Sequence, residues 1–202
     1  MRLFLIMLFL GGAAHGVVVN DGSFEDGPCD GGSAWTCFAD HGQPEICPTI
    51  LNPSGPWGNP AYDGNLAVWL GGVCENEGIS NSVCQDLVLT PSELSWQWMG
   101  YWTLEGEQEA SVLVTVDGET AWEHLMTGDD HTIGTWANSA DTFGPVSLKE
   151  WEDGLSHNLC FVFDNSYANN GSTTASMLVD RVELSHPVAV EVATFSTIKV
   201  LY

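Results

Sequence analysis

Basic side chains are nearly missing from this sequence. Lys and Arg together number 4, against 27 Asp and Glu, and the formal net charge at pH 7 is -23. A surface this negative repels phosphate groups, which excludes nucleic acid and anionic membranes as partners. The acidity is compatible with divalent cations, with neutral sugars, or with a saline habitat in which salt screens the repulsion between like charges.

Long apolar runs are also missing, apart from the first residues. Residues 3–10 are all Leu, Phe, Ile or Met; they follow Met1-Arg2 and precede small residues that end at Gly16. This is the layout of a secretory signal peptide, and the run is shorter than the roughly 20 residues that span a bilayer. We predict a signal peptide over residues 1–16, one domain over 17–186, and an apolar tail or extra edge strand over 187–202.

Motifs of common enzyme classes are absent from the sequence. There is no Gly-x-Ser-x-Gly elbow, no His-Glu-x-x-His zinc motif and no phosphate-binding loop. Paired carboxylates of a glycoside hydrolase remain compatible with so acidic a chain, because their separation is set by the folded structure. We predict that the protein is not an enzyme and keep a small polysaccharide-active enzyme as a third alternative.

Six cysteines follow the predicted signal peptide. An even number of cysteines in an exported protein predicts disulfides, and the absence of Cys-x-x-Cys argues against a zinc site. Sequence alone does not select among the possible pairings. Because short loops close easily, we expect Cys37 to pair with Cys47 and Cys74 with Cys84, which leaves Cys29 and Cys160.

Hydrophobic residues alternate with polar ones along most of the mature chain, which is typical of half-buried strands. The alternating sets are Leu94, Trp96 and Trp98; Val112, Val114 and Val116; Leu159, Phe161 and Phe163; and Leu178, Asp180, Val182 and Leu184. The turn dipeptide Asp117-Gly118 predicts a hairpin after the valine set. No segment has the pattern of an amphipathic helix. The sequence therefore predicts an all-β fold, an antiparallel β-sandwich of jelly-roll type.

Several short motifs occur in the order found in a known group of domains. They are Asn20 to Glu25, Gly42 to Cys47, Gly64 to Gly72, Cys84 to Leu89, Val116 to Gly118, His157 to Phe161, and Leu178 to Leu184. This order resembles galactose-binding-like jelly-roll domains attached to secreted bacterial proteins, a fold shared by many carbohydrate-binding modules. The resemblance covers about residues 20–185.

The resemblance implies a structural calcium ion. In such jelly rolls the Glu of the opening segment and the Asp of the closing strand share the ion, which corresponds here to Glu25 and Asp180, with Asp21 and backbone carbonyls completing the shell. Calcium takes about six to eight oxygen ligands. Asp180 also lies on an otherwise apolar stripe, where a buried carboxylate requires a partner. The alternative to calcium as that partner is a backbone amide or a hydroxyl. The chain departs from the family at Arg181, where a second Asp is common.

Aromatic residues provide the candidate ligand-binding side chains, because their faces stack on sugar rings. Trp35, Trp69, Trp96 and Trp98 are expected in the core. The candidates for binding lie in turn-rich or strand-end segments: Trp57, Tyr101, Trp102, Trp136 and Tyr167. Packing of these aromatics within loops is the simpler alternative. We predict a secreted, calcium-stabilised binding module for carbohydrate or an extracellular surface; the alternative is a structural surface or matrix protein without a small ligand.

Overall fold

The computed structural model describes residues 19–29, 32–39, 49–53, 60–71, 80–90, 92–102, 109–127, 135–164 and 175–185. The predicted signal peptide (1–16) and tail (187–202) lie outside these residues and stay predictions, as do the domain bounds 17–186.

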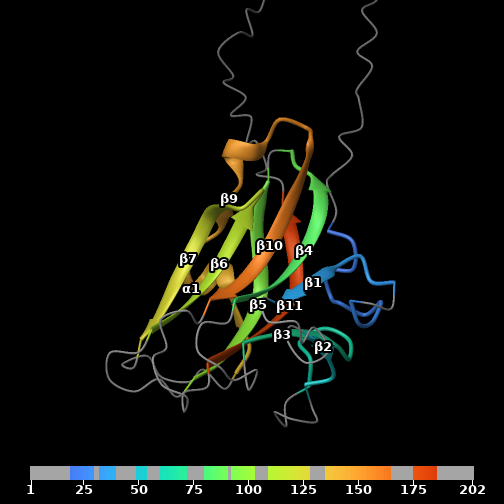
Figure 1. The fold of residues 1–202 in the computed structure, drawn as a ribbon, viewed down its shortest axis with the longest axis vertical. Coiled ribbons are helices and arrows are strands. Elements are labelled where there is room, and N and C mark those ends of the chain that lie inside the picture. Colours follow the sequence, from blue (N-terminus) through green and yellow to red (C-terminus); the bar gives the residue numbers. More distant parts are fainter. Residues whose placement is uncertain are drawn as a thin grey trace, which may run out of the picture.

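Five strands form the first sheet, sheet A, in the spatial order β1-β4-β10-β6-β7 (Figure 1). Its neighbouring strands are all antiparallel. The strands are β1 (Thr36–Ala39), β4 (Ser80–Val88), β10 (Ser156–Asp164), β6 (Glu109–Val116) and β7 (Glu119–Thr127). The central pair, β4 and β10, joins segments far apart in the sequence, so sheet A depends on long-range contacts.

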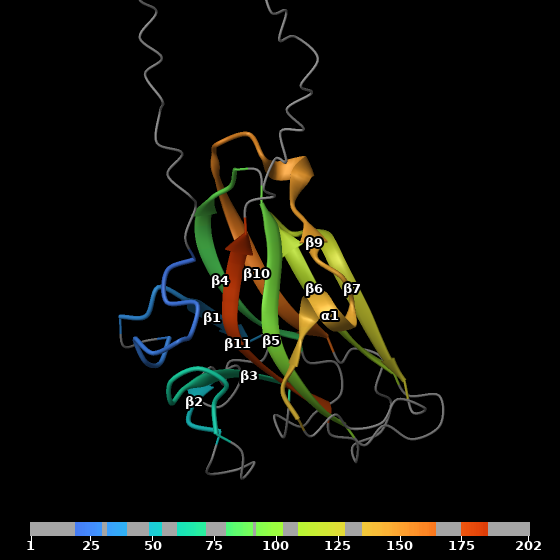
Figure 2. The same ribbon diagram turned by 180° about the vertical axis from the view of Figure 1, so that it is seen from behind.

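The second sheet, sheet B, has the order β2-β3-β11-β5-β8, and β9 also pairs with β5. Its strands are β2 (Thr49–Leu51), β3 (Ala67–Gly71), β11 (Ala175–Ser185), β5 (Glu93–Trp102), β8 (Ala137–Asn138) and β9 (Val146–Ser147), with the short helices α1 (Ser139–Thr142) and η1 (Lys149–Trp151) beside them. Seen from behind, β11 and β5 lie in front of sheet A (Figure 2). The two antiparallel sheets confirm the predicted β-sandwich of jelly-roll type.

Helices play a small part in the described chain. Both α1 and η1 are single short turns at the edge of the sandwich. No helix among the described residues is long and apolar enough to cross a lipid bilayer.

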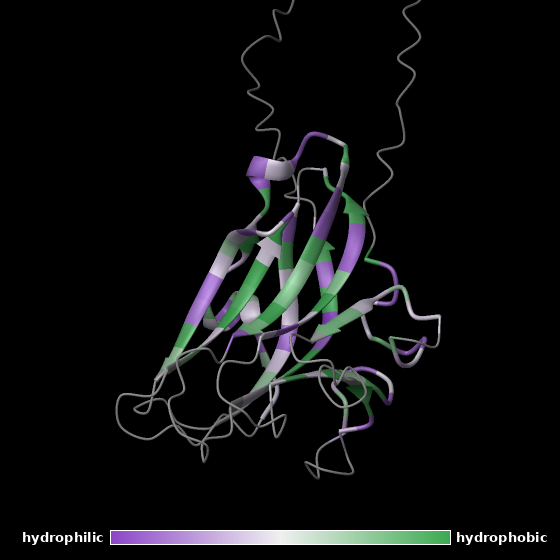
Figure 3. Cartoon of the chain, viewed as in Figure 1, coloured by the Kyte–Doolittle hydropathy of each residue, from purple (hydrophilic) through white to green (hydrophobic). Residues whose placement is uncertain are grey.

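The alternating runs place their large apolar side chains between the sheets. The three predicted residues of β5, Leu94, Trp96 and Trp98, are buried. Figure 3 shows hydrophobic segments interspersed with hydrophilic ones along the strands of both sheets. Trp96 of sheet B contacts Phe161 and Trp122 of sheet A edge to face, with ring centroids 5.2 and 5.1 Å apart. Aromatic contacts of this geometry add about 0.5–1.5 kcal/mol each to the free energy of burial, so they help hold the two sheets together.

The predicted hairpin is confirmed at Asp117-Gly118, which connects β6 to β7. Both residues have positive φ, 52° and 82°. A two-residue type I′ turn requires this conformation at both positions, and Asp-Gly adopts it at low cost.

The predicted stripe along β11 is only partly correct. Met177, Val179 and Val182 belong to the core cluster, so strand alternation puts Leu178 and Asp180 on the opposite face of sheet B. The change of face occurs because the register shifts between Asp180 and Glu183. We call this irregular segment, residues 180–183, the β11 bulge; an extra residue in a strand is the feature that a strict period of two cannot predict.

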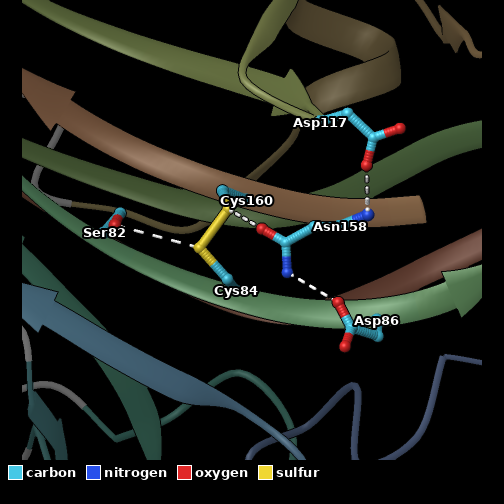
Figure 4. The surroundings of a disulfide bond; sticks show 6 residues. All are labelled: Ser82, Cys84, Asp86, Asp117, Asn158 and Cys160. Atoms are coloured by element: carbon cyan, nitrogen blue, oxygen red, sulfur yellow. Dashed lines mark hydrogen bonds between the residues drawn. A yellow bond between two sulfur atoms is a disulfide. The ribbon is translucent and has the colours of Figure 1, made fainter.

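The disulfides differ from the expected pairs. Cys29 bonds Cys37, and Cys84 bonds Cys160 across β4 and β10 (Figure 4). The predicted partners of Cys37 and Cys84 were therefore wrong, while Cys47 and Cys74 lie outside the described residues. Cys84 and Cys160 are separated by 76 positions, yet they are direct partners in the antiparallel register. Strand pairing, and not a short separation in sequence, brings these two thiols together.

Candidate functional site

One loop on the outer side of sheet B, residues 60–66, is held in place by carboxylates from distant segments. We call it the Tyr62 loop. Asp180 in β11 is fully buried and accepts a hydrogen bond from the N–H of Asp63 at 2.9 Å. Its second oxygen accepts the N–H of Arg181 at 2.7 Å. Burial raises the pKa of Asp180 to about 6, and these backbone N–H groups oppose the rise. The buried carboxylate thus joins the loop to the β11 bulge.

Glu25 anchors the other half of the Tyr62 loop. Its Oε1 atom accepts the backbone N–H groups of Asn65 at 2.7 Å and Leu66 at 2.6 Å. Gly64 between these contacts has φ +72°, and a Cβ added there would lie 2.4 Å from the Glu25 carboxyl carbon. The backbone conformation therefore favours glycine at this position, and a side chain there would displace the Glu25 carboxylate from its contacts with Asn65 and Leu66.

The predicted calcium ligands do not form an oxygen cage in this arrangement. Glu25 and Asp180 both meet the Tyr62 loop, but each directs its oxygens to N–H donors. Asp21 Oδ2 accepts the N–H of Asp26 at 3.2 Å. In the described part of the chain no group of three or more His, Cys, Asp and Glu side chains could hold a metal ion. Because calcium requires about six to eight oxygens, the three residues as placed do not fit it, and calcium binding stays a prediction.

Two aromatic side chains meet at the edge of the Tyr62 loop. The rings of Tyr62 and Trp136 are in edge contact with centroids 6.2 Å apart. Tyr62 is 44% exposed, and the indole N–H of Trp136 donates to the Pro60 carbonyl at 3.0 Å, which fixes the pair to one loop. The guanidinium carbon of Arg181 lies 5.8 Å from the Tyr62 ring centroid, within cation–π range. We call Tyr62 and Trp136 the aromatic pair.

A groove of about 450 Å³ is lined in part by Arg181, which contacts the Tyr62 ring, and by Asp63, which follows Tyr62 in the chain. Its polar lining consists of Ser23, Asp63, Arg181, Glu183 and Ser185. The Ser23 hydroxyl donates to Asp63 Oδ2 at 2.9 Å, and Arg181 Nε donates to Glu183 Oε1 at 2.7 Å. Since Arg181 also contacts Tyr62, it connects the groove to the aromatic pair, and together they offer an aromatic face, hydrogen-bond donors and acceptors.

The backbone at Arg181 is unusual. Its φ is +46°, a left-handed conformation that is uncommon outside glycine. The next residue, Val182, donates its N–H to the Gly22 carbonyl at 2.8 Å, and a Cβ on Gly22 would lie 2.3 Å from the Val182 carbonyl oxygen. Such strain persists only where surrounding contacts enforce it, and it concentrates at functional sites. The β11 bulge therefore directs Arg181 into the groove at a cost that the Gly22 and Asp180 contacts offset.

The predicted ligand-binding aromatics have different outcomes. Trp136 belongs to the aromatic pair. Tyr101 and Trp102 form the end of β5, but their side chains are outside the description, and Trp57 and Tyr167 lie outside the described residues. Of the five candidates, the structure thus brings one to the site.

Sequence reasoning missed Tyr62 and Arg181. Tyr62 precedes Asp63-Gly64-Asn65, a turn signal of the same kind that selected Trp57 and Trp136. Arg181 was considered only as a departure from the family pattern, although it is one of just 4 basic residues. The sequence offered one signal for Arg181: it is a rare basic residue directly after Asp180, a predicted ligand residue. The Tyr62–Arg181 contact itself follows from the bulge, which the sequence does not reveal.

A second polar cluster lies near η1 and the start of β10, away from β2 and β3 in Figure 1. His157, which is 8% exposed, has Asp117 Oδ2 at 2.7 Å from Nδ1 and Asp153 Oδ1 at 2.9 Å from Nε2. Hydrogen bonds to both carboxylates raise the pKa of His157. The backbone N–H of Asn158, and after it the His157 ring, lowers the pKa of Asp117, while the His157 ring is the main cause of the lowered pKa of Asp153. This cluster ties the β6–β7 turn to β10 and has a structural role.

Comparisons with known proteins bear on the fold. No protein-family model and no curated protein sequence matches this chain. Among solved structures, the carbohydrate-binding module TmCBM61 in complex with beta-1,4-galactotriose is 14% identical, with a TM-score of 0.50, over 84% of this chain and 97% of that chain. The K3 cleaved adhesin domain of Lys-gingipain from Porphyromonas gingivalis is also 14% identical, with a TM-score of 0.50, over 85% and 100%.

Because both structures are only 14% identical to this chain, their similarity shows a shared fold alone. A cyclase from Fischerella sp. is 11% identical over 74% of this chain and 81% of that chain, with a lower TM-score of 0.41. The chain has the antiparallel β-sandwich fold of carbohydrate-binding modules and cleaved adhesin domains.

Proposed function

We propose that the protein is a secreted, non-catalytic module that binds carbohydrate at the aromatic pair and the adjoining groove. The observation that carries the proposal is the exposed Tyr62 ring, which contacts Trp136 and also Arg181, a residue that lines a groove together with Asp63 and Glu183. A sugar ring has apolar C–H faces that pack on aromatic rings and hydroxyl groups that bond to guanidinium and carboxylate. Ligand sites combine such surfaces in a concave, largely pre-formed setting.

Secretion is supported by the two described disulfides, since such bonds persist in oxidising compartments. The fold shared with TmCBM61 and the gingipain adhesin domain also agrees with a binding role outside the cell. The galactotriose bound by TmCBM61 is one sensible first probe, alongside other neutral oligosaccharides.

The test is a glycan array followed by calorimetry on the best oligosaccharide. Tyr62→Ala is expected to weaken binding by about tenfold, a change of about 1.4 kcal/mol, because it removes the aromatic face on which the apolar side of a sugar ring packs. Phe38→Ala is the matched control, since Phe38 is 53% exposed on β1 of sheet A and is not among the residues that line the groove. Equal losses in both variants would contradict the assigned site.

Two other outcomes decide between the alternatives. If the wild-type protein binds none of the glycans on the array, the result would favour a structural surface or matrix protein without a small ligand. Release of reducing sugar from purified polysaccharides would contradict the non-catalytic proposal and favour a polysaccharide-active enzyme.

A further inference from the structure

We infer that the groove selects neutral glycans and rejects those carrying carboxylate groups, and that Asp63 and Glu183 set this selection. The inference rests on the proposed function and specifies its ligand class. The groove presents one guanidinium, that of Arg181, and two carboxylates, those of Asp63 and Glu183. Its positive charge is therefore already outweighed by the two carboxylates before any ligand binds.

The hydrogen bonds within the groove leave groups that suit hydroxyls. Arg181 uses Nε for Glu183, so among the described residues its two terminal nitrogens remain as donors. Asp63 uses Oδ2 for the Ser23 hydroxyl, which leaves Oδ1 as an acceptor. A sugar hydroxyl both donates and accepts, so it can bond to the guanidinium and to the carboxylate at the same time. A uronate carboxylate only accepts, and it would face Asp63 and Glu183 with the same charge.

The net charge of the whole chain also disfavours the binding of carboxylated glycans. The net charge of -23 opposes the approach of any polyanion before short-range contacts form. The guanidinium alone would favour a carboxylate, but Glu183, whose Oε1 lies 2.7 Å from Arg181 Nε, already offsets its positive charge. The site is thus complementary to a neutral chain of sugars.

The first experiment is an array that holds neutral polymers (galactan, mannan, glucan and xylan) together with polygalacturonate and alginate. We expect signals confined to neutral polymers. Binding of polygalacturonate or alginate above every neutral polymer, lost in Tyr62→Ala, would overturn this inference while leaving the proposed function intact. No signal on any polymer would remove the proposed function, and the inference with it.

The second experiment assigns the selection to the groove. The double variant Asp63→Asn with Glu183→Gln keeps the acceptors for Ser23 and Arg181 but removes both charges. The control Glu119→Gln with Glu150→Gln removes the same charge at exposed positions in β7 and η1. At low salt we expect polygalacturonate binding to rise by about tenfold in the groove variant over the control, the scale of effect that close charges produce at interfaces. Equal rises in both variants would show that net charge alone sets the selection and would overturn the role of Asp63 and Glu183.

Discussion

A single buried carboxylate, Asp180, connects the two halves of the candidate site. Its oxygens accept N–H groups from Asp63 in the Tyr62 loop and from Arg181 in the β11 bulge. Asp180 was predicted either to bind calcium or to pair with a backbone amide or hydroxyl, and its observed partners are backbone amides. These two N–H donors explain how one acidic residue can join the Tyr62 loop to the β11 bulge.

Removing Asp180 should destabilise the protein without any dependence on metal. In Asp180→Ala the N–H groups of Asp63 and Arg181 lose their acceptor, and a hydrogen bond to a charged group contributes about 1.5–3 kcal/mol. We expect a lower melting temperature than for the exposed control Asp141→Ala. A chelator such as EGTA should leave the melting temperature of the wild-type protein unchanged. A fall with EGTA that Asp180→Ala abolishes would instead establish calcium at this position.

The His157 cluster predicts a dependence of stability on pH. The folded pKa of His157 is raised by hydrogen bonds to Asp117 and Asp153, so its contribution is full below the unfolded pKa of about 6.5 and is lost as pH rises through the folded value. The two aspartates have lowered pKa values, so their contribution is lost as pH falls below about 4. The cluster is therefore most stabilising between these limits.

Urea unfolding of the wild-type protein and His157→Gln at about pH 5 and about pH 8.5 measures this effect. The difference in unfolding free energy between the two proteins should be larger at the lower pH. Asp153→Asn should lower the pKa of His157 followed by NMR. A difference independent of pH would show that His157 contributes by packing alone.

At the scale of elements, the Tyr62 loop depends on close backbone approach. Gly64→Ala would place a methyl group against the Glu25 carboxylate at a backbone φ of +72°. Gly144→Ala is the matched control, because φ there is +83° and nothing lies within 4 Å of an added Cβ. Both variants incur the backbone cost of about 1 kcal/mol, but only Gly64→Ala should also weaken glycan binding. Equal affinities in the two variants would contradict a link between the Glu25 anchor and the aromatic pair.

The strands could be predicted from the sequence, whereas the contacts between them could not. Alternation located β5, β6 and β10, and the Asp117-Gly118 turn located a hairpin, because both signals are local. The Cys84–Cys160 bond and the approach of Arg181 to Tyr62 depend on register and on the β11 bulge. A shift of one residue in register moves every side chain of a strand to the other face, so these features appear only in the folded chain.

At the scale of the whole molecule, the charge that limits partners must also oppose folding. With 27 acidic and 4 basic side chains, the folded state concentrates like charges that the unfolded chain keeps farther apart. Raising NaCl from about 10 mM to about 1 M shortens the Debye length from about 30 to about 3 Å. The melting temperature should therefore rise with salt, and KCl should act equally if screening is the cause.

Affinity for a neutral oligosaccharide should change little over the same range, because its hydroxyls carry no net charge. A melting temperature that is flat or falls with both salts would show that self-repulsion does not limit stability. A rise with one cation alone would indicate specific ion binding.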